Sequence, residues 1–280
     1  QELIALNKKG HDIRVLETPN LNNVRYDAVV ADFKSITPEW ERFLTQCALN
    51  RIPVLNSEQV FESLTGRVRI RHMTENNIGS LLPSPLFEFI KTCFDWVVVV
   101  LTLPITLPLV LVTALLVKLE SSGPAFFCQT RVGLGNKPFR MYKIRSMRHD
   151  IEAEHNEVFA EEDDPRVTRI GKIIRKLRID ELPQLLNILK GEMSLIGPRP
   201  EQPSFVEEYD QKIPFYSYRH VVKPGITGWA QVRYGYTSDV DETQIKIEHD
   251  FFYIKHCSIS LDFYITLLTL KTMLTGFGAR

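Results

Sequence analysis

The chain has 280 residues, which is enough for one large domain or two small ones. Apolar residues make up 44% and charged residues 24%, which excludes a disordered chain, a collagen-like fibre and a disulfide-stabilised mini-protein. Lysine plus arginine and aspartate plus glutamate number 34 each, so the formal net charge is zero. We therefore expect no nucleic-acid partner and no binding of polyanions over the whole surface.

Residues 1–66 have the pattern of a small α/β unit. The expected elements are strands at 12–18 and 26–31, a helix at 37–49, a strand at 52–55 and a helix at 57–64 closed by Gly66. This order predicts a partial Rossmann-like accessory domain, and the lack of a GxGxxG motif gives no support for dinucleotide binding. Because the chain begins at Gln1, we expect it to be a piece of a longer protein, with further strands of this sheet upstream.

A linker rich in turn signals covers 67–90 and leads into a segment that departs from the soluble pattern. Residues 96–117 are twenty-two consecutive residues without a charge. As a straight helix they would reach about 33 Å, close to the thickness of a bilayer's hydrocarbon core. The sequence therefore predicts membrane insertion over residues 91–118.

Pro104 and Pro108 lie in the middle of this segment and are expected to bend or break it. Two geometries are open, a kinked helix that crosses the bilayer and a broken helix that enters and leaves by the same face. Basic residues flank the segment on both sides, so the positive-inside rule does not favour a crossing. We expect the re-entrant form, with backbone groups at the bend satisfied by side chains such as Thr102 or Thr106.

The remaining unit, 119–280, has its charges sorted into blocks. Residues 121–149 hold six basic residues and no acid, 150–164 hold eight acids and no Lys or Arg, and 165–179 again hold six basic residues and no acid. We interpret the basic blocks as contacts to anionic lipid, with some cations available for a phosphorylated substrate. The acidic block is expected to be an exposed mobile loop or helix.

The stretch after the second basic block carries the candidate catalytic residues. Residues 170–179 predict a basic amphipathic helix, and because proline is tolerated only in a first turn, Pro183 places the start of a new helix near Asp180. Asp180 and Glu181 would then lie at a helix N-terminus, where the helix dipole favours their ionised forms. Taken alone, this pair is better explained as an ordinary helix cap, with a capping Asp followed by a first-turn Glu.

Two turn-rich stretches follow and change that interpretation. In the first, Arg199 is held between two prolines, which suits bidentate phosphate recognition. In the second, residues 223–232, a tryptophan and two glycines allow close approach of the backbone to a ligand. Two carboxylates, fixed cations and glycine loops beside a membrane fit phosphoryl transfer from a nucleotide to a lipid phosphate, assisted by a divalent metal.

Three stretches resemble the motifs of a known family, namely MYKIRSM (141–147), DDPRVTRIGKIIRKLRIDELPQLLNILKGEMSLIGPRP (163–200) and PGITGWAQV (224–232). They are similar to the bacterial sugar transferases known as monotopic polyprenyl-phosphate phosphoglycosyl transferases, over roughly residues 85–280. The N-terminal unit looks like a truncated form of the regulatory α/β domain of longer members. The implied fold is α/β, with a re-entrant membrane helix-break-helix and a mainly helical catalytic domain with surface amphipathic helices.

The resemblance also implies a reaction. A sugar 1-phosphate would move from a nucleotide diphosphosugar, commonly a UDP-sugar, to undecaprenyl phosphate, releasing UMP through a covalent aspartyl phosphosugar intermediate, with Mg²⁺ as cofactor. The location implied is the cytoplasmic face of the bacterial inner membrane. The step would be the first membrane step of exopolysaccharide, capsule or O-antigen synthesis.

By motif, Asp180 would be the nucleophile and Glu181 the metal-associated partner, with both at the Mg²⁺ site. The implied substrate- and phosphate-binding residues are Lys143, Arg145, Arg175, Arg199 and Asp250. The break in the family's membrane helix carries a Ser-Pro pair, and here the matching pair is Leu103-Pro104. The sugar cannot be read from the sequence, and its side of the site is expected between 201 and 250, where Tyr209, Tyr216, Tyr218, Arg219 and His220 cluster.

Several alternatives stay open at this level. The apolar stretch 259–274 has a polar stripe, so it suits either the membrane interface or a helix covering the catalytic domain. The unit could also be a scaffold that has lost catalysis, or a membrane-associated nucleotidase or phosphatase that transfers to water. A homodimer through the N-terminal unit is a further possibility.

Overall fold

A computed structural model describes residues 12–20, 26–70, 82–148, 164–234 and 240–275. The chain divides into two compact units, Gln1–Val68 and Arg69–Arg280. The second unit, which contains both the apolar segment and the candidate catalytic residues, is the one that positions the site.

The first unit is built around a parallel pair of strands, β1 (Val29–Ala31) and β2 (Val54–Asn56), joined through helix α2 (Pro38–Leu49). Phe43 of α2 packs with Val29 in its small core. Helix α3 (Ser57–Thr65) follows and ends at Gly66, which has a left-handed conformation with φ of 66°. The strand–helix–strand order agrees with the prediction from sequence.

The strand expected at 12–18 is not present. Val15 is exposed, and Asp12 and Arg14 pair with each other at the surface, with 2.8 Å between Oδ2 and Nη2. A lone extended segment with no buried face lacks the packing that stabilises a strand. The sequence alternates in a way that suits a strand, but the described residues give it no partner.

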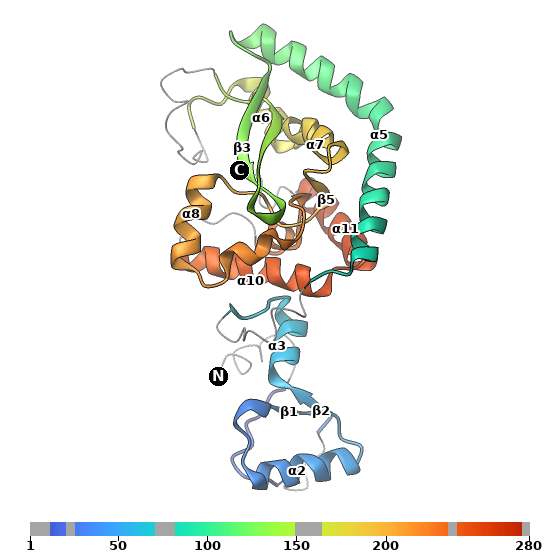
Figure 1. The fold of residues 1–280 in the computed structure, drawn as a ribbon, viewed down its shortest axis with the longest axis vertical. Helices are drawn as coiled ribbons and strands as arrows, with labels where there is room; N and C mark the ends of the chain where they lie inside the picture. Colours follow the sequence, from blue (N-terminus) through green and yellow to red (C-terminus); the bar gives the residue numbers. More distant parts are fainter. Residues whose placement is uncertain (1–11, 21–25, 71–81, 149–163, 235–239, 276–280) are drawn as a thin grey trace. The chain divides into compact units, whose positions relative to one another are not determined.

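The second unit begins with α5 (Pro85–Glu120), a helix of 36 residues. Within the described ranges it is the one helix that is long and apolar enough to cross a membrane. Ser84 caps its start by accepting a hydrogen bond from the backbone N–H of Phe87 at 3.2 Å. Figure 1 shows that α5 runs along the outside of this unit and bends as it does so. The predicted helix-break-helix is therefore one bent helix, and it includes the end of the predicted linker.

Helix α5 contains Pro104 and Pro108, each of which removes the hydrogen bond to the carbonyl four residues earlier. Thr102 Oγ1 donates to the carbonyl of Val98 at 2.9 Å, and Thr106 Oγ1 donates to that of Thr102 at 3.1 Å. Neither carbonyl is one that a proline has freed, so the expected compensation by these threonines is wrong. Back-bonding of this kind instead favours bending of a helix.

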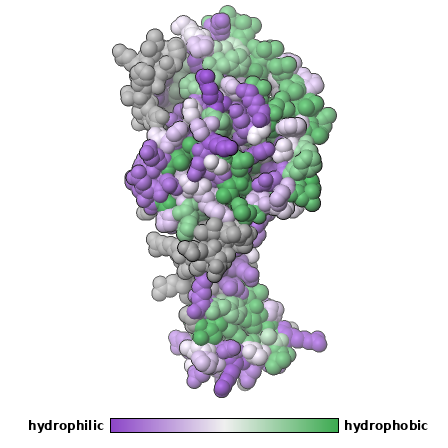
Figure 2. All heavy atoms as spheres, viewed as in Figure 1, coloured by the Kyte–Doolittle hydropathy of each residue, from purple (hydrophilic) through white to green (hydrophobic). Residues whose placement is uncertain are grey.

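The side chains of α5 are distributed in the opposite sense to those of a helix in a soluble protein. Apolar residues such as Leu101 and Ile105 point outward, and Ile105 is 74% exposed, whereas the polar residues Asp95 and Thr113 are buried. Figure 2 shows the resulting hydrophobic surface along the edge where α5 runs. An exposed apolar area of this extent marks an interaction with a membrane or another protein.

Helix α11 (Ile259–Thr275) shows the same inversion. Its Asp262 is buried and accepts hydrogen bonds from Lys91 Nζ of α5 at 2.5 Å and from Tyr253 Oη at 2.8 Å. Thr269 Oγ1 lies 2.8 Å from Thr227 Oγ1. The exposed large side chains of this helix are Ile259, Phe263, Tyr264, Leu267, Leu270 and Met273. The polar stripe thus faces the protein, which favours the membrane-interface interpretation of α11.

The rest of the unit is mainly helical, as predicted, and its described residues also form two small sheets that the sequence did not predict. Strands β3 (Phe126–Val132) and β4 (Pro138–Ile144) form an antiparallel hairpin, while β5 (Ser194–Ile196) and β6 (Gly225–Thr227) pair in parallel. The helices are α6 (Arg169–Lys176), α7 (Leu185–Leu189), α8 (Pro203–Lys212), α9 (Trp229–Arg233) and α10 (Val240–His256), with short 3₁₀ turns η5 (Leu134–Asn136), η7 (Ile179–Gln184) and η8 (Tyr216–Val221). Most of the predicted acidic block lies outside the described residues.

Candidate functional site

The two candidate carboxylates are presented by η7, a short 3₁₀ turn rather than the start of an α-helix. Arg178, just before it, adopts a left-handed conformation with φ of 53°, which reverses the chain direction after α6. Pro183 lies inside the turn, and regular α-helical structure begins only after it, in α7. The helix predicted to start near Asp180 therefore begins as a tighter turn, and η7 and α7 both pack against α5.

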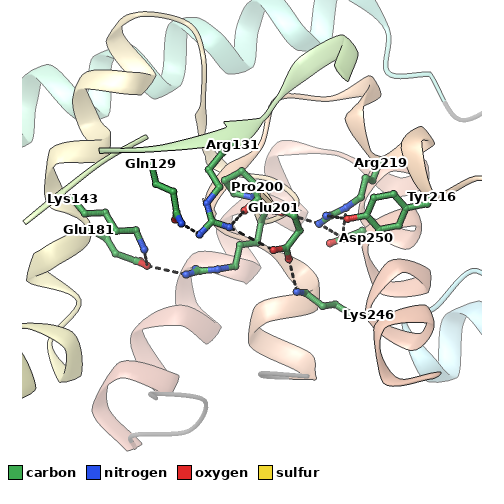
Figure 3. A network of polar contacts seen from close by, with 11 residues as sticks. Gln129, Arg131, Lys143, Glu181, Pro200, Glu201, Tyr216, Arg219, Lys246 and Asp250 are labelled. Carbon is green, nitrogen blue, oxygen red and sulfur yellow. Dashed lines mark hydrogen bonds and ion pairs between the residues drawn. The ribbon is translucent and has the colours of Figure 1, made fainter. Parts of the chain in front are cut away.

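Glu181 is buried and is surrounded by three cations. Its Oε1 lies 3.3 Å from Arg199 Nη2 and 3.6 Å from Lys143 Nζ, while its Oε2 lies 3.6 Å from Arg178 Nη1. Figure 3 shows Lys143 pointing at Glu181 from the hairpin. Burial alone would raise the pKa of Glu181, but the charges of Arg199, then Lys143 and Arg178, outweigh it and lower the pKa to about 2.

Asp180 is only half-buried, and its pKa is raised, whereas that of Glu181 is lowered. Burial, and next the negative charge of Glu181, raise the pKa of Asp180 to about 6 against the opposing charges of Lys143 and Arg175. The dipole that was expected to favour ionisation of both carboxylates is outweighed at Asp180. Neighbouring carboxylates with pKa values displaced in opposite directions are typical of sites where the two groups have different chemical roles.

The cations reach the carboxylates from separate elements. Lys143 lies on β4, Arg175 on α6, and Arg199 on the loop between β5 and α8. Burial lowers the pKa of the Lys143 ammonium, although Glu181 opposes this change. The structure thus gathers three of the predicted phosphate-binding residues around the carboxylate pair.

Arg145, a fourth predicted phosphate-binding residue, is not part of this group. Its buried guanidinium donates to the carbonyl of Ser121 at 2.8 Å and to that of Ser122, at the C-terminal end of α5. Both carbonyls come directly after Glu120, the last residue of α5, so Arg145 holds the chain at the point where this helix ends. The sequence motif that contains both Lys143 and Arg145 therefore combines one residue of the site with one residue that anchors the membrane helix.

Asp250 also lies away from the carboxylate pair. Its Oδ2 accepts hydrogen bonds from Arg219 Nη2 at 2.7 Å and Nε at 3.1 Å, and the two side chains are only 2% and 1% exposed. Arg219 Nη2 in turn donates to the carbonyl of Arg199 at 2.8 Å. Asp250 therefore reaches the site through the backbone of Arg199, and it does so as a positioning residue.

Other members of the expected sugar-side cluster are also interior. Tyr216 and His220 are buried, and Tyr216 Oη accepts a hydrogen bond from Arg219 Nη1 at 3.1 Å. Burial lowers the pKa of His220 to about 3, with the charge of Arg219 adding to the effect. This part of the cluster is therefore packing around the Arg219–Asp250 pair.

Sequence reasoning missed a buried ion cluster next to Arg199. Glu201 accepts a hydrogen bond from Lys246 Nζ at 2.9 Å and lies 3.6 Å from Arg131 Nη1, and Arg131 also donates to the carbonyl of Pro200 at 3.2 Å. Figure 3 shows Glu201 between these two cations. Burial alone would raise the pKa of Glu201, but the charges of Lys246, Arg219 and Arg131 outweigh it and lower the pKa to about 2. Its one sequence signal was an acid directly after the GPRP motif.

The glycines of the two turn-rich stretches bring these stretches together. A Cβ at Gly197 would lie 2.4 Å from the carbonyl oxygen of Lys223, and one at Gly228 would lie 2.1 Å from that of Gly197. The close approach that the structure shows is therefore between the two protein loops. Trp229 of the second loop is buried and stacks on Phe252, with 5.5 Å between ring centroids.

Asp180 and Glu181 also fit a divalent metal as two of its ligands. Among the described residues no group of three or more His, Cys, Asp or Glu side chains is placed to hold a metal by itself. Mg²⁺, however, is commonly held by one or two carboxylates, with water and substrate phosphates completing its coordination. Glu181 Oε2 is buried and accepts no hydrogen bond from the described residues, and a metal at this oxygen would share it with the ion pair to Arg178 Nη1 at 3.6 Å.

The site thus combines buried opposing charges around a carboxylate pair with a neighbouring helix whose apolar side chains point outward. The chain belongs to the bacterial sugar transferase family, whose sequence model matches residues 86–276. This match includes α5, the carboxylate pair and all the cations around it.

Similar proteins carry more specific names. A UDP-N-acetylgalactosamine-undecaprenyl-phosphate N-acetylgalactosaminephosphotransferase of Aeromonas hydrophila is 59% identical over 95% of this chain and 63% of its own length. A UDP-glucose:undecaprenyl-phosphate glucose-1-phosphate transferase of Caulobacter vibrioides is 44% identical over 72% of this chain and 76% of its own. A UDP-glucose:undecaprenyl-phosphate glucose-1-phosphate transferase of Escherichia coli K12 is 37% identical over 80% of this chain and 48% of its own length. The chain thus spans less than two thirds of the Aeromonas and E. coli relatives.

The opposite pKa values of the carboxylate pair give a test. In Glu181→Gln we expect the pKa of Asp180 to fall below about 6, because the variant removes the nearest negative charge and leaves the cations in place. The measurement is a ¹³C NMR titration of carboxyl-labelled aspartates in detergent micelles. Asp164, whose pKa is lowered to about 2 by its hydrogen bond with Arg166, is the internal control and should not move. An Asp180 pKa that stays at about 6 or rises would contradict this account.

Proposed function

We propose that the chain transfers a sugar 1-phosphate from a UDP-sugar to undecaprenyl phosphate and releases UMP. The observation that carries the proposal is the Asp180–Glu181 pair, with one carboxylate fixed among cations and its neighbour free to react. The names of the relatives support the substrates, since each contains undecaprenyl phosphate and a UDP-sugar. The step would begin the membrane stage of exopolysaccharide, capsule or O-antigen synthesis.

In the first half-reaction the Asp180 carboxylate attacks the phosphorus that bears the sugar. The bond from this phosphorus to the bridging oxygen breaks, and UMP leaves with the electron pair. In the second half-reaction a phosphate oxygen of undecaprenyl phosphate attacks the same phosphorus, and Asp180 leaves as a carboxylate. Splitting one displacement into two steps at a single residue is the usual gain of covalent catalysis.

The environment of Asp180 suits a nucleophile. Its carboxylate is ionised above a pH of about 6, and it is only half-buried, so a phosphoryl group can reach it. Glu181 suits a supporting role, because it is buried and ionised and holds Lys143 and Arg199 beside the reacting group. Those two cations would oppose the charge that builds up on the phosphoryl oxygens.

We propose Mg²⁺ as the cofactor, held by Asp180 and Glu181. When bound, it would neutralise charge on the diphosphate of the donor. Lys143, Arg178 and Arg199 do not replace the metal, because each of them is already paired with Glu181.

The position of the site supports a lipid acceptor over water. Trp96 Nε1 of α5 donates to the carbonyl of Ile188 in α7 at 3.1 Å, which joins the membrane helix to the element that follows the carboxylate pair. We propose that α5 is re-entrant and that α11 lies at the interface, which puts the catalytic unit on the cytoplasmic face of the inner membrane in contact with its lipids. We also propose that the N-terminal unit mediates a homodimer.

An assay in detergent tests the reaction. We expect UMP release that depends on undecaprenyl phosphate and Mg²⁺, from at least one UDP-sugar of a panel that includes N-acetylgalactosamine and glucose. Asp180→Asn should reduce this release at least about a thousandfold, since it removes the nucleophile. Asp210→Asn is the matched control, because Asp210 is exposed on α8 and accepts a hydrogen bond that asparagine can also accept.

The same assay separates the alternatives. Release without lipid at the full rate would indicate a nucleotidase and contradict the transfer. If the folded protein releases no UMP with any sugar of the panel, this result would favour a scaffold that has lost catalysis. Full activity in Asp180→Asn would show that another residue is the nucleophile.

The re-entrant geometry has its own test. In a chain with its four native cysteines replaced, Leu82→Cys and Ser122→Cys place single thiols just outside the two ends of α5. We expect both thiols to react with a membrane-impermeant maleimide in inside-out vesicles and neither to react in right-side-out vesicles. Labelling of the two flanks from opposite faces would show that α5 crosses the membrane.

A further inference from the structure

Two amide side chains lie close together in the segment that carries the carboxylates, and the structure treats them very differently. Asn187 is fully buried and has several hydrogen bonds, from its Nδ2 to the carbonyl of Arg140 and to Glu192 Oε2, both at 2.7 Å, and from the backbone N–H of Tyr142 to its Oδ1 at 3.2 Å. It is a structural residue, because these bonds join α7 to the hairpin strand β4.

Gln184 is also largely buried, with 3% of its surface exposed, and no hydrogen bond joins its side-chain amide to the residues that the structure describes. Its amide atoms are not among the fully enclosed unpaired polar atoms, so the small exposed part of the side chain includes the amide, which can meet solvent or a ligand. The side chain lines a small pocket together with Arg131, Met141, Arg199, Pro200 and Gly225. Its polar end therefore has a place to meet a group that the protein itself does not supply.

The pocket adjoins the carboxylate pair. Gln184 follows Glu181 by three residues in η7, and in a 3₁₀ turn side chains three residues apart lie on the same side. Arg199 belongs to both places, since it lines the pocket and lies 3.3 Å from Glu181 Oε1. A group bound in this pocket would therefore be next to the point at which Asp180 reacts.

The chemistry of the pocket favours an oxyanion. Two of its lining side chains, Arg131 and Arg199, are guanidiniums, which match phosphate oxygens in charge and geometry. None of the described lining residues is acidic, although Arg131 pairs with Glu201 and Arg199 with Glu181. The amide of Gln184 adds a neutral N–H donor, which can bind a phosphoryl oxygen without adding a further charge to be neutralised.

We propose that the side-chain amide of Gln184 donates a hydrogen bond to an oxygen of the phosphoryl group that passes from donor to acceptor. The inference rests on the proposed function. It adds a residue that contacts the reacting group and takes part in both half-reactions, since the same phosphoryl group is present in each. A contact with the nucleotide alone would act only in the first.

The test compares Gln184→Met with Asn187→Leu, two buried amides replaced by apolar side chains of similar size. Without ligand, Gln184→Met should melt at the same temperature as the parent chain, because no hydrogen bond within the described protein is lost and the side-chain size is kept. Asn187→Leu should melt roughly 4–8 °C lower, because it leaves the hydrogen-bonding groups of Arg140, Tyr142 and Glu192 without their partner.

Binding and kinetics then locate the contact. With inorganic pyrophosphate and Mg²⁺ as the probe, calorimetry should give a dissociation constant about tenfold higher for Gln184→Met than for the parent chain. Two rates should each fall by about 10- to 100-fold in Gln184→Met. The first is UMP release in a single turnover without lipid, and the second is transfer of the sugar phosphate from the covalent intermediate to undecaprenyl phosphate.

Unchanged pyrophosphate affinity would overturn the proposal, and so would slowing of the first half-reaction alone or a loss of melting temperature in Gln184→Met that matches Asn187→Leu. Failure of the proposed function looks different. In that case the parent chain would transfer no sugar phosphate to lipid, while the difference in pyrophosphate affinity between it and Gln184→Met would remain and would support the contact.

Discussion

The burial of one ionised carboxylate among three cations is the constraint on which the site depends. Glu181 could not remain charged inside the unit without Arg199, Lys143 and Arg178, because an unpaired buried charge is strongly unfavourable. These residues come from the hairpin, the turn before η7 and the loop after β5, so the ion cluster joins three separate parts of the fold. Burial, and next the charge of Glu181, raise the pKa of Asp180, so the titration of one carboxylate depends in part on the placement of the other.

Support for this cluster comes from the backbone around Arg199. The carbonyl of Arg199 accepts from Arg219, which Asp250 holds, and the next carbonyl accepts from Arg131, which lies against Glu201. A buried ion pair is not by itself a source of stability, and here its value is geometric. On the membrane side, Lys91–Asp262 and Trp96–Ile188 fix α5 to the body that carries the carboxylates. Chemistry and membrane attachment are therefore parts of one connected arrangement.

Local sequence patterns were sufficient for much of this. The apolar length of α5 and the parallel strand–helix–strand order follow from periodicity and capping residues. The proximity of Lys143, Arg175 and Arg199 to the carboxylate pair follows from the resemblance of their motifs to those of the family. The directions in which side chains point do not follow from local sequence patterns. Arg145 shares a strand motif with Lys143 but turns to the end of α5, Asp250 reaches the site only through Arg219, and the two glycine loops approach each other. Each of these depends on contacts between residues that are distant in sequence, and no local pattern contains them. The unpartnered amide of Gln184 was invisible for the same reason.

The central claim is that Asp180 carries the sugar phosphate between the two substrates. Its most direct test is intact-mass spectrometry of the chain after brief incubation with a UDP-sugar that it uses, with Mg²⁺ and without undecaprenyl phosphate. The account predicts a mass gain of one phosphosugar that maps to the peptide containing Asp180, that disappears on addition of the lipid phosphate, and that is absent in Asp180→Asn. Normal turnover with no such adduct on the quenched enzyme, or an adduct on a different residue, would contradict it.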